Sequence, residues 1–158
     1  MSKAQTGMEY LVDELISTEE LKKAEKMYND QATRGAPSIE AQFGYALSLI
    51  RSKGDNIRKG VAMMKELLTK DEDNLAKRDY LYYISVGNLK LKNYDEALKF
   101  INALIRAEPT NSQAIELKAF IESRMKRDAM VGGAILGGAA LAGGAILVGA
   151  IVAAANRK

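Results

Sequence analysis

A run of 27 residues without a charged side chain, residues 129–155, constrains this chain more than any other feature. A helix needs about 20 apolar residues to cross a hydrocarbon core of roughly 30 Å, whereas apolar runs of 10 to 14 residues are typical of buried globular helices. The basic residues Arg124, Lys126 and Arg127 precede the run, and residues 156–158 follow it as a short basic tail. The sequence therefore predicts a C-terminal transmembrane helix, a tail anchor, that leaves the preceding residues in the cytosol.

The predicted anchor is rich in small residues, with 10 Ala and 7 Gly among its 27 positions. Such a span is only moderately hydrophobic. Gly133 and Gly137 form a GxxxG pair, a pattern that lets two membrane helices approach closely. These glycines are a candidate homodimer contact; the alternative is a chance pair in a low-complexity run. A disordered Gly/Ala tail is disfavoured, because branched and long apolar residues are spread along the whole run.

Composition excludes several classes of function. The residues before the anchor carry 21 Lys and Arg against 20 Asp and Glu, so they show no basic footprint for nucleic acid. The chain has no Cys and no His, which removes disulfides, thiolate metal sites and the commonest general base. We therefore expect a protein that is not an enzyme, with no catalytic residues, no metal site and no cofactor.

The remaining sequence reads as helices throughout. Apolar residues recur at helical spacing, no stretch alternates with a period of two, and Ser17 and Ser38 stand where helix caps are expected. Residues 1–7 are expected to be a mobile arm, and residues 8–128 an all-α domain of about seven helices. The expected helices cover residues 8–16, 18–34, 39–50, 57–68, 80–91, 94–107 and 115–125.

An internal repeat explains the order of these helices. Residues 41–74 and 78–111 align at an offset of 37, close to the 34-residue period of tetratricopeptide repeats. In the second copy, Ser85 and Ala97 supply small residues where the two helices of a repeat meet. The predicted fold is a tetratricopeptide-repeat-like array of two repeats plus flanking helices; a plain helical bundle is the alternative.

The first helix of each repeat is expected to line a concave groove. In the 41/78 register the inward positions are mostly apolar with lysine at the edge, which would suit an amphipathic partner helix. We expect Leu49 and Leu89 to be half open there. We also expect residues 1–16 to compete for the same groove through a stripe formed by Met8, Leu11, Val12 and Leu15. The alternative is that Tyr45 and Tyr82 are ordinary core or surface tyrosines. The inward positions are Gln42, Tyr45, Leu49, Ser52, Lys53, Asp79, Tyr82, Val86, Leu89 and Lys90.

Four stretches carry a resemblance to a known family. They are LIRSKGDNIRKGVAMMKELL at 49–68, RDYLYYISVGNLKLKNYDEALKF at 78–100, EPTNSQA at 108–114, and the Gly-rich anchor. The chain resembles the mitochondrial fission 1 proteins along its whole length, through a short N-terminal arm, two tetratricopeptide-like repeats and a tail anchor.

The resemblance implies a receptor anchored in the outer membranes of mitochondria and peroxisomes, with its domain facing the cytosol. Such a receptor recruits adaptor proteins and, through them, a dynamin-related GTPase that divides the organelle. Weak anchor hydrophobicity further suggests that Arg157 and Lys158, with the basic residues before the span, direct it to mitochondria. A tetratricopeptide-type preprotein-import receptor, or another tail-anchored docking receptor, is the alternative function. The family's groove carries onto Tyr45, Leu49, Ser52, Lys53, Tyr82, Tyr83, Val86, Leu89 and Lys90.

Overall fold

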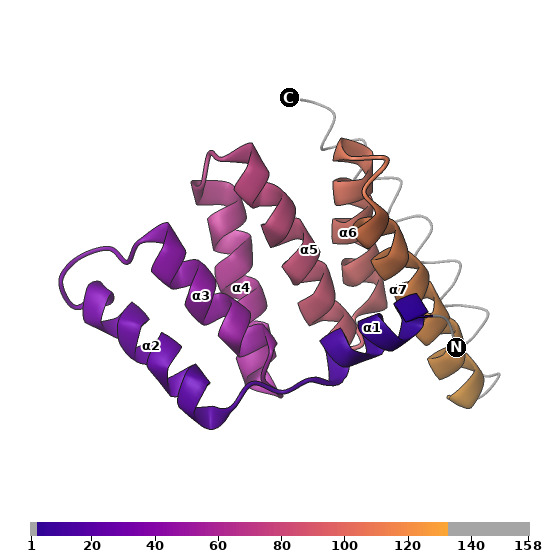
Figure 1. The fold of residues 1–158 in the computed structure, drawn as a ribbon, viewed down its shortest axis with the longest axis horizontal. Helices are drawn as coiled ribbons and strands as arrows, with labels where there is room; N and C mark the ends of the chain where they lie inside the picture. The colour runs from indigo at the N-terminus through magenta and orange to yellow at the C-terminus, as the bar shows by residue number, and fades with distance from the viewer. Residues whose placement is uncertain (1–2, 133–158) are drawn as a thin grey trace.

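The computed structural model describes residues 3–132, which form seven α-helices and no strand (Figure 1). Helices α2 to α7 stand in a row, each packed on the next, and α1 returns across the array to contact α5 and α7. The prediction of an all-α domain is confirmed for this part of the chain. The bounds are α1 Lys3–Asp13, α2 Thr18–Ala32, α3 Ile39–Ile50, α4 Asp55–Lys70, α5 Asn74–Lys90, α6 Tyr94–Ala107 and α7 Ser112–Val131.

Polar side chains cap four of the helices. At the start of α2, the Ser17 hydroxyl accepts from the Glu20 amide and the Glu20 carboxylate accepts in return from the Ser17 amide, which is a capping box. Ser38 caps α3, as predicted, and Asp73 and Asn111 cap α5 and α7. Each such cap satisfies a backbone donor that the helix itself leaves unpaired.

Three boundaries differ from those predicted by more than three residues. Helix α1 begins at Lys3, so part of the predicted arm is helical, and α5 begins at Asn74 rather than at residue 80. The first turn of α5 has only one large apolar residue, the exposed Leu75, so no apolar stripe marks its start. Helix α7 runs on to Val131, so the first residues of the predicted anchor extend a helix of the domain.

Within residues 3–132, no helix combines the length and the apolar character needed to span a membrane. The predicted anchor from residue 133 onward lies outside the described residues. The same is true of the predicted dimer contact, Gly133 and Gly137, and of the tail residues Arg157 and Lys158.

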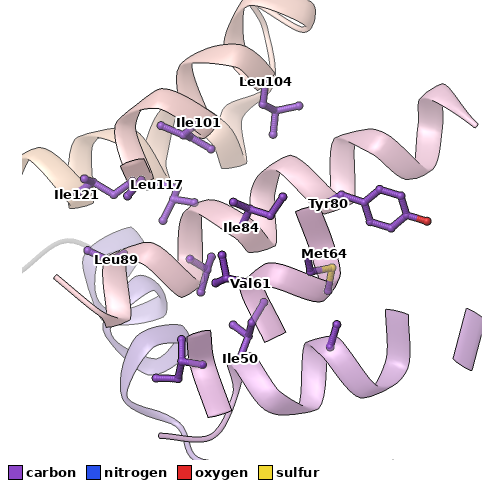
Figure 2. Close-up of a cluster of buried hydrophobic side chains, with 14 of the residues drawn as sticks. Ile50, Val61, Met64, Tyr80, Ile84, Leu89, Ile101, Leu104, Leu117 and Ile121 are labelled. Carbon is purple, nitrogen blue, oxygen red and sulfur yellow. The ribbon is translucent and has the colours of Figure 1, made fainter. Parts of the chain in front are cut away.

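The core runs through the array, between successive helices (Figure 2). Met64, Ile84 and Leu117 are among its fully buried side chains and come from three different helices. Two antiparallel helix pairs, α3 with α4 and α5 with α6, form the repeating units. This arrangement buries the apolar face of each pair against its neighbour, as in other repeat arrays.

Each pair closes at a contact between small residues. A methyl group at Gly60 would lie 2.7 Å from the Ala46 carbonyl oxygen, and the Ser85 hydroxyl donates to the Ala97 carbonyl at 2.8 Å. Gly60 follows Ala46 by 14 residues, whereas Ala97 follows Ser85 by 12. The first repeat therefore holds two extra residues between its closing contacts.

Candidate partner-binding groove

A cavity of about 220 Å³ opens where α1 crosses α3 and α5. We call it the groove. Its walls are mostly aliphatic, with Tyr83 and two cationic residues in the lining, so it presents an apolar surface with a charged edge. Its lining residues are Leu11 from α1, Leu47, Ile50 and Arg51 from α3 and its C-cap, and Tyr83, Val86 and Lys90 from α5.

Aromatic rings cluster beside Tyr83. The Tyr83 ring lies 5.4 Å from the Tyr82 ring and 6.1 Å from the Phe43 ring, both in edge-on geometry. Burial raises the pKa of Tyr82 to about 12 and also raises the pKa of Tyr83. Both phenols therefore stay neutral at physiological pH and can offer a hydroxyl to a partner without a charge.

Lys90 lies on the same helix as Tyr83, about two turns further along α5, and its side chain reaches toward the end of α3. Its ammonium donates to the carbonyl oxygens of Ile50 at 2.7 Å and Ser52 at 3.2 Å. Burial lowers the pKa of Lys90, and the two carbonyls compensate part of that cost by accepting its protons. The side chain thus ties α5 to the end of α3 and sets the separation of the two groove walls.

Seven of the nine predicted groove residues line the groove, pack beside it or line an adjoining cavity. Tyr83, Val86 and Lys90 line it directly, and Tyr82 packs on Tyr83. Ser52, Lys53 and Leu89 line a second cavity, which shares Lys90 as a wall. Leu89 was expected in the groove but lines only the second cavity, and its expected openness is wrong because only 4% of its surface is exposed.

Tyr45 and Leu49 lie elsewhere, which corrects the expected placement. The Tyr45 ring lies 5.2 Å from that of Tyr28 on α2, and its hydroxyl accepts from Lys59 of α4 at 3.1 Å. The Leu49 Cβ lies 2.9 Å from the position of a methyl group on Gly60. Tyr45 is 3% exposed and Leu49 is 2% exposed. Both are core residues between α3 and its neighbours, not groove residues.

The two extra residues of the first repeat explain this error. The predicted register aligns α4 with α6 at an offset of 37 and applies the same offset to α3 and α5. The closing contacts instead make Ala46 the equivalent of Ser85, which corresponds to an offset of 39. That offset puts Leu47 and Ile50 at the positions of Val86 and Leu89, and it adds Phe43 and Arg51 to the concave face. No local sequence signal marks this offset; the contact between Ala46 and Gly60 in the structure fixes it.

Helix α1 occupies one side of the groove. Leu11 lines the groove itself, and Met8 is 9% exposed in the core. Two contacts hold residues 14–17, the segment between α1 and α2. The Ile16 amide donates to the Arg51 carbonyl at 2.9 Å, and Glu14 forms an ion pair with Arg51 at 3.5 Å. Of the expected stripe, Leu11 thus reaches the groove, whereas Met8 lies in the core and Val12 and Leu15 line the second cavity.

The basic residues predicted to flank the anchor lie on the last turns of α7. Arg124 stacks over the Phe120 ring at 4.9 Å, and Arg127 lies 3.3 Å from the Asp128 carboxylate. Both also line the second cavity, whereas Lys126 is exposed and lines neither cavity. The three residues thus differ in their surroundings, although they share one helix end.

Comparison with known proteins places this geometry in a family. Residues 78–130 match the sequence model described as the Fis1 C-terminal tetratricopeptide repeat. The chain is 46% identical over 128 residues to the mitochondrial fission 1 protein of Homo sapiens, across 80% of this chain and 84% of that one. It is 34% identical over 120 residues to the mitochondrial fission 1 protein of Mycosarcoma maydis, across 75% and 78% of the two chains.

Solved structures show the same fold. The crystal structure of yeast Fis1 in complex with an Mdv1 fragment, which contains N-terminal extension and coiled coil domains, matches with a TM-score of 0.67 and 25% sequence identity. The match covers 75% of this chain and 91% of the yeast chain. The crystal structure of the fission protein Fis1 from Saccharomyces cerevisiae also matches with a TM-score of 0.67 and 25% identity.

Proposed function

Because this chain belongs to the mitochondrial fission 1 protein family, we propose that its groove binds a helical segment of an adaptor protein. The adaptor would in turn recruit a dynamin-related GTPase to the outer membranes of mitochondria and peroxisomes. The yeast relative crystallised with an Mdv1 fragment supports this reading, because the two chains share the fold over most of their lengths.

The observation that carries the proposal is the occupant already present in the groove. Leu11 of the amphipathic helix α1 lies among the side chains of α3 and α5. A groove that accepts one amphipathic helix from its own chain has the width and the apolar lining to accept another. Aliphatic anchors on the adaptor would replace Leu11, and an adaptor hydroxyl or carbonyl could pair with Tyr83.

Helix α1 would then compete with the adaptor. Among the described helices, α1 makes substantial contacts only with α5 and α7. Tyr10 of α1 is 67% exposed, and Leu15, which follows the helix, is 56% exposed. A helix of 11 residues is marginally stable by itself, so its release exposes groove surface at a small cost. The adaptor's apparent affinity should therefore rise when residues 1–13 are removed.

Binding experiments with matched variants test the groove. Leu47→Ala and Tyr83→Ala remove groove side chains that are only partly buried, and Leu75→Ala removes an apolar side chain of α5 that is 65% exposed outside the groove. Truncated interface anchors typically cost 2 kcal/mol or more, about 30-fold in affinity. Titration calorimetry with the adaptor fragment should show that loss for both groove variants and no change for Leu75→Ala. Equal affinity of all three variants would place the adaptor on another surface.

The membrane part of the proposal has a separate test. A fluorescent fusion of the full chain should lose mitochondrial localisation when Arg157 and Lys158 are both replaced by Ser. A fusion in which Lys22 and Lys23 are replaced by Ser is the control, because it removes the same charge from the exposed face of α2. Unchanged localisation of the first fusion would show that the tail charge is not needed.

A further inference from the structure

The second cavity is a separate feature with its own chemistry. It has a volume of about 320 Å³ and lies between the end of α1, the turns that precede α4 and α6, and the last turns of α7. Five cationic residues and one carboxylate line it, although the chain as a whole holds 23 Lys and Arg against 20 Asp and Glu. Overall composition therefore does not explain the concentration of positive charge. The charged lining residues are Lys53, Lys90, Lys92, Arg124, Arg127 and Asp13.

Much of this charge is not neutralised by neighbours. Lys92 and Arg127 share one acidic partner, Asp128, at 3.5 Å and 3.3 Å. Within residues 3–132, Lys53 and Arg124 form no ion pair. An anion in the cavity would thus meet cationic groups without having to displace a carboxylate from each of them.

The backbone adds to the same potential. Helices α4 and α6 begin at this cavity, where Gly54 and Tyr94 are part of the lining, and neither helix has a side-chain cap. Uncapped helix starts carry partial positive charge from their free amide groups. The caps of α2, α3, α5 and α7 make the contrast clear, since each of those helices has a side-chain acceptor at its start.

We propose that this cavity binds the phosphate group of a phosphomonoester. Its volume is at the lower end of ligand pockets, which suits a compact headgroup rather than a large molecule. Arginine and lysine are the side chains that bind phosphate most effectively, through charge-assisted hydrogen bonds. Within the described residues, Arg124 and Lys53 supply donors free of ion pairs, and the repulsion of an anion by the single carboxylate, Asp13, is opposed by five cationic residues.

Position in the chain favours a lipid headgroup as the source of the phosphate. Arg127 stands five residues before Gly132, a rise of about 7.5 Å along a helix. No charged residue follows between residues 129 and 156. The cavity therefore lies close to the point where the predicted anchor begins, within reach of a headgroup at a membrane surface. A soluble phosphate would meet the same donors, so the test separates the two sources.

Calorimetry on the full chain in a neutral detergent provides the test. The probes are inorganic phosphate, dihexanoyl phosphatidic acid and, as a zwitterionic reference, dihexanoyl phosphatidylcholine. The cavity variants are Arg124→Gln and Lys53→Gln, and the matched control is Lys126→Gln, which removes one charge from the same helix end outside the cavity. Circular dichroism checks that each variant keeps its helical fold.

We expect the phosphomonoester lipid to bind the wild-type chain, with about a 10-fold loss of affinity in each cavity variant and less than a twofold change in Lys126→Gln. Binding of phosphatidic acid alone identifies the lipid source, and binding of inorganic phosphate with the same variant pattern identifies a soluble one. Absence of binding, equal loss in all three variants, or equal affinity for phosphatidylcholine would overturn the proposal. Equal loss would mean diffuse attraction to a basic helix end.

Discussion

Gly60 is a described glycine at which an added carbon atom would meet the backbone of another helix. A methyl group there would lie 2.7 Å from the Ala46 carbonyl oxygen and 2.9 Å from both Ile50 Cγ1 and Leu49 Cβ. Real Cβ contacts are longer, and a backbone oxygen cannot rotate away as a side chain can. Gly60→Ala therefore forces α3 and α4 apart at the contact on which the first repeat closes.

The magnitude follows from two opposing terms. Overpacking of a core typically costs about 1 to 3 kcal/mol, and the backbone contact favours the upper value. Replacing Gly by Ala inside a helix returns about 1 kcal/mol. We expect Gly60→Ala to lower the free energy of unfolding by about 2 kcal/mol.

Gly44 provides the matched control. It lies in α3, and a methyl group there meets nothing within 4 Å. Gly44→Ala should therefore gain only the higher helix propensity of Ala and raise the free energy of unfolding by up to about 1 kcal/mol. Urea unfolding of both variants, followed by circular dichroism, measures the difference. If Gly60→Ala matched or exceeded the stability of wild type, the close approach of α3 and α4 would be refuted.

Three further predictions concern the domain as a whole. Residues 1–132 should form a soluble helical monomer by circular dichroism and gel filtration, because the core is shared among helices that end within this range; an aggregate would contradict it. Leu89→Ala should lower the free energy of unfolding, measured in urea, by about 2 to 5 kcal/mol, because this side chain is only 4% exposed. A decrease below about 1 kcal/mol would indicate that Leu89 is half open, as the sequence predicts. The hydroxyl of Tyr94 lowers the pKa of Asp128 from 3.8, so this pair stabilises the fold above pH 4 and loses that contribution as the pH falls through the lowered value. In Tyr94→Phe, the free energy of unfolding should therefore fall less steeply as the pH is lowered below about 4. An unchanged pH dependence would show that the pair is not formed.

Local sequence signals were sufficient for most of the helix boundaries. The capping box at Ser17 and the cap at Ser38 depend on neighbours three residues away, and the structure confirms both. Helix α6 has the expected bounds because its apolar stripe begins at Tyr94 and Pro109 follows its end. The apolar period does not reveal the start of α5, because the only large apolar residue of its first turn, Leu75, is exposed and its cap, Asp73, stands in an acidic stretch typical of a loop.

The concave face could not be predicted from the repeat alone. An alignment at one offset assumes that both repeats have turns of equal length, and a difference of two residues rotates a helix by about 200°. That rotation moves Tyr45 and Leu49 from the groove to the opposite side of α3 and brings Leu47 and Ile50 in their place. Only the spatial pairing of Ala46 with Gly60 fixes the rotation, and that pairing is a tertiary fact.

The longer turn of the first repeat also explains the burial of Lys90, and this leads to a last prediction. The turn leaves the carbonyls of Ile50 and Ser52 pointing at α5, where the Lys90 ammonium donates to both. Lys90→Met keeps the length of the side chain but removes both donors, so two carbonyl oxygens lose their charged partner. Hydrogen bonds to a charged group contribute about 1.5 to 3 kcal/mol, and the relief of burying a charge offsets part of that loss. We expect a net loss of about 2 kcal/mol in urea unfolding of residues 1–132. Lys53→Met, in the same turn but exposed, should change stability by less than about 0.5 kcal/mol. Equal stability of Lys90→Met and wild type would mean that the two carbonyls find water instead, and that Lys90 does not hold the groove walls together.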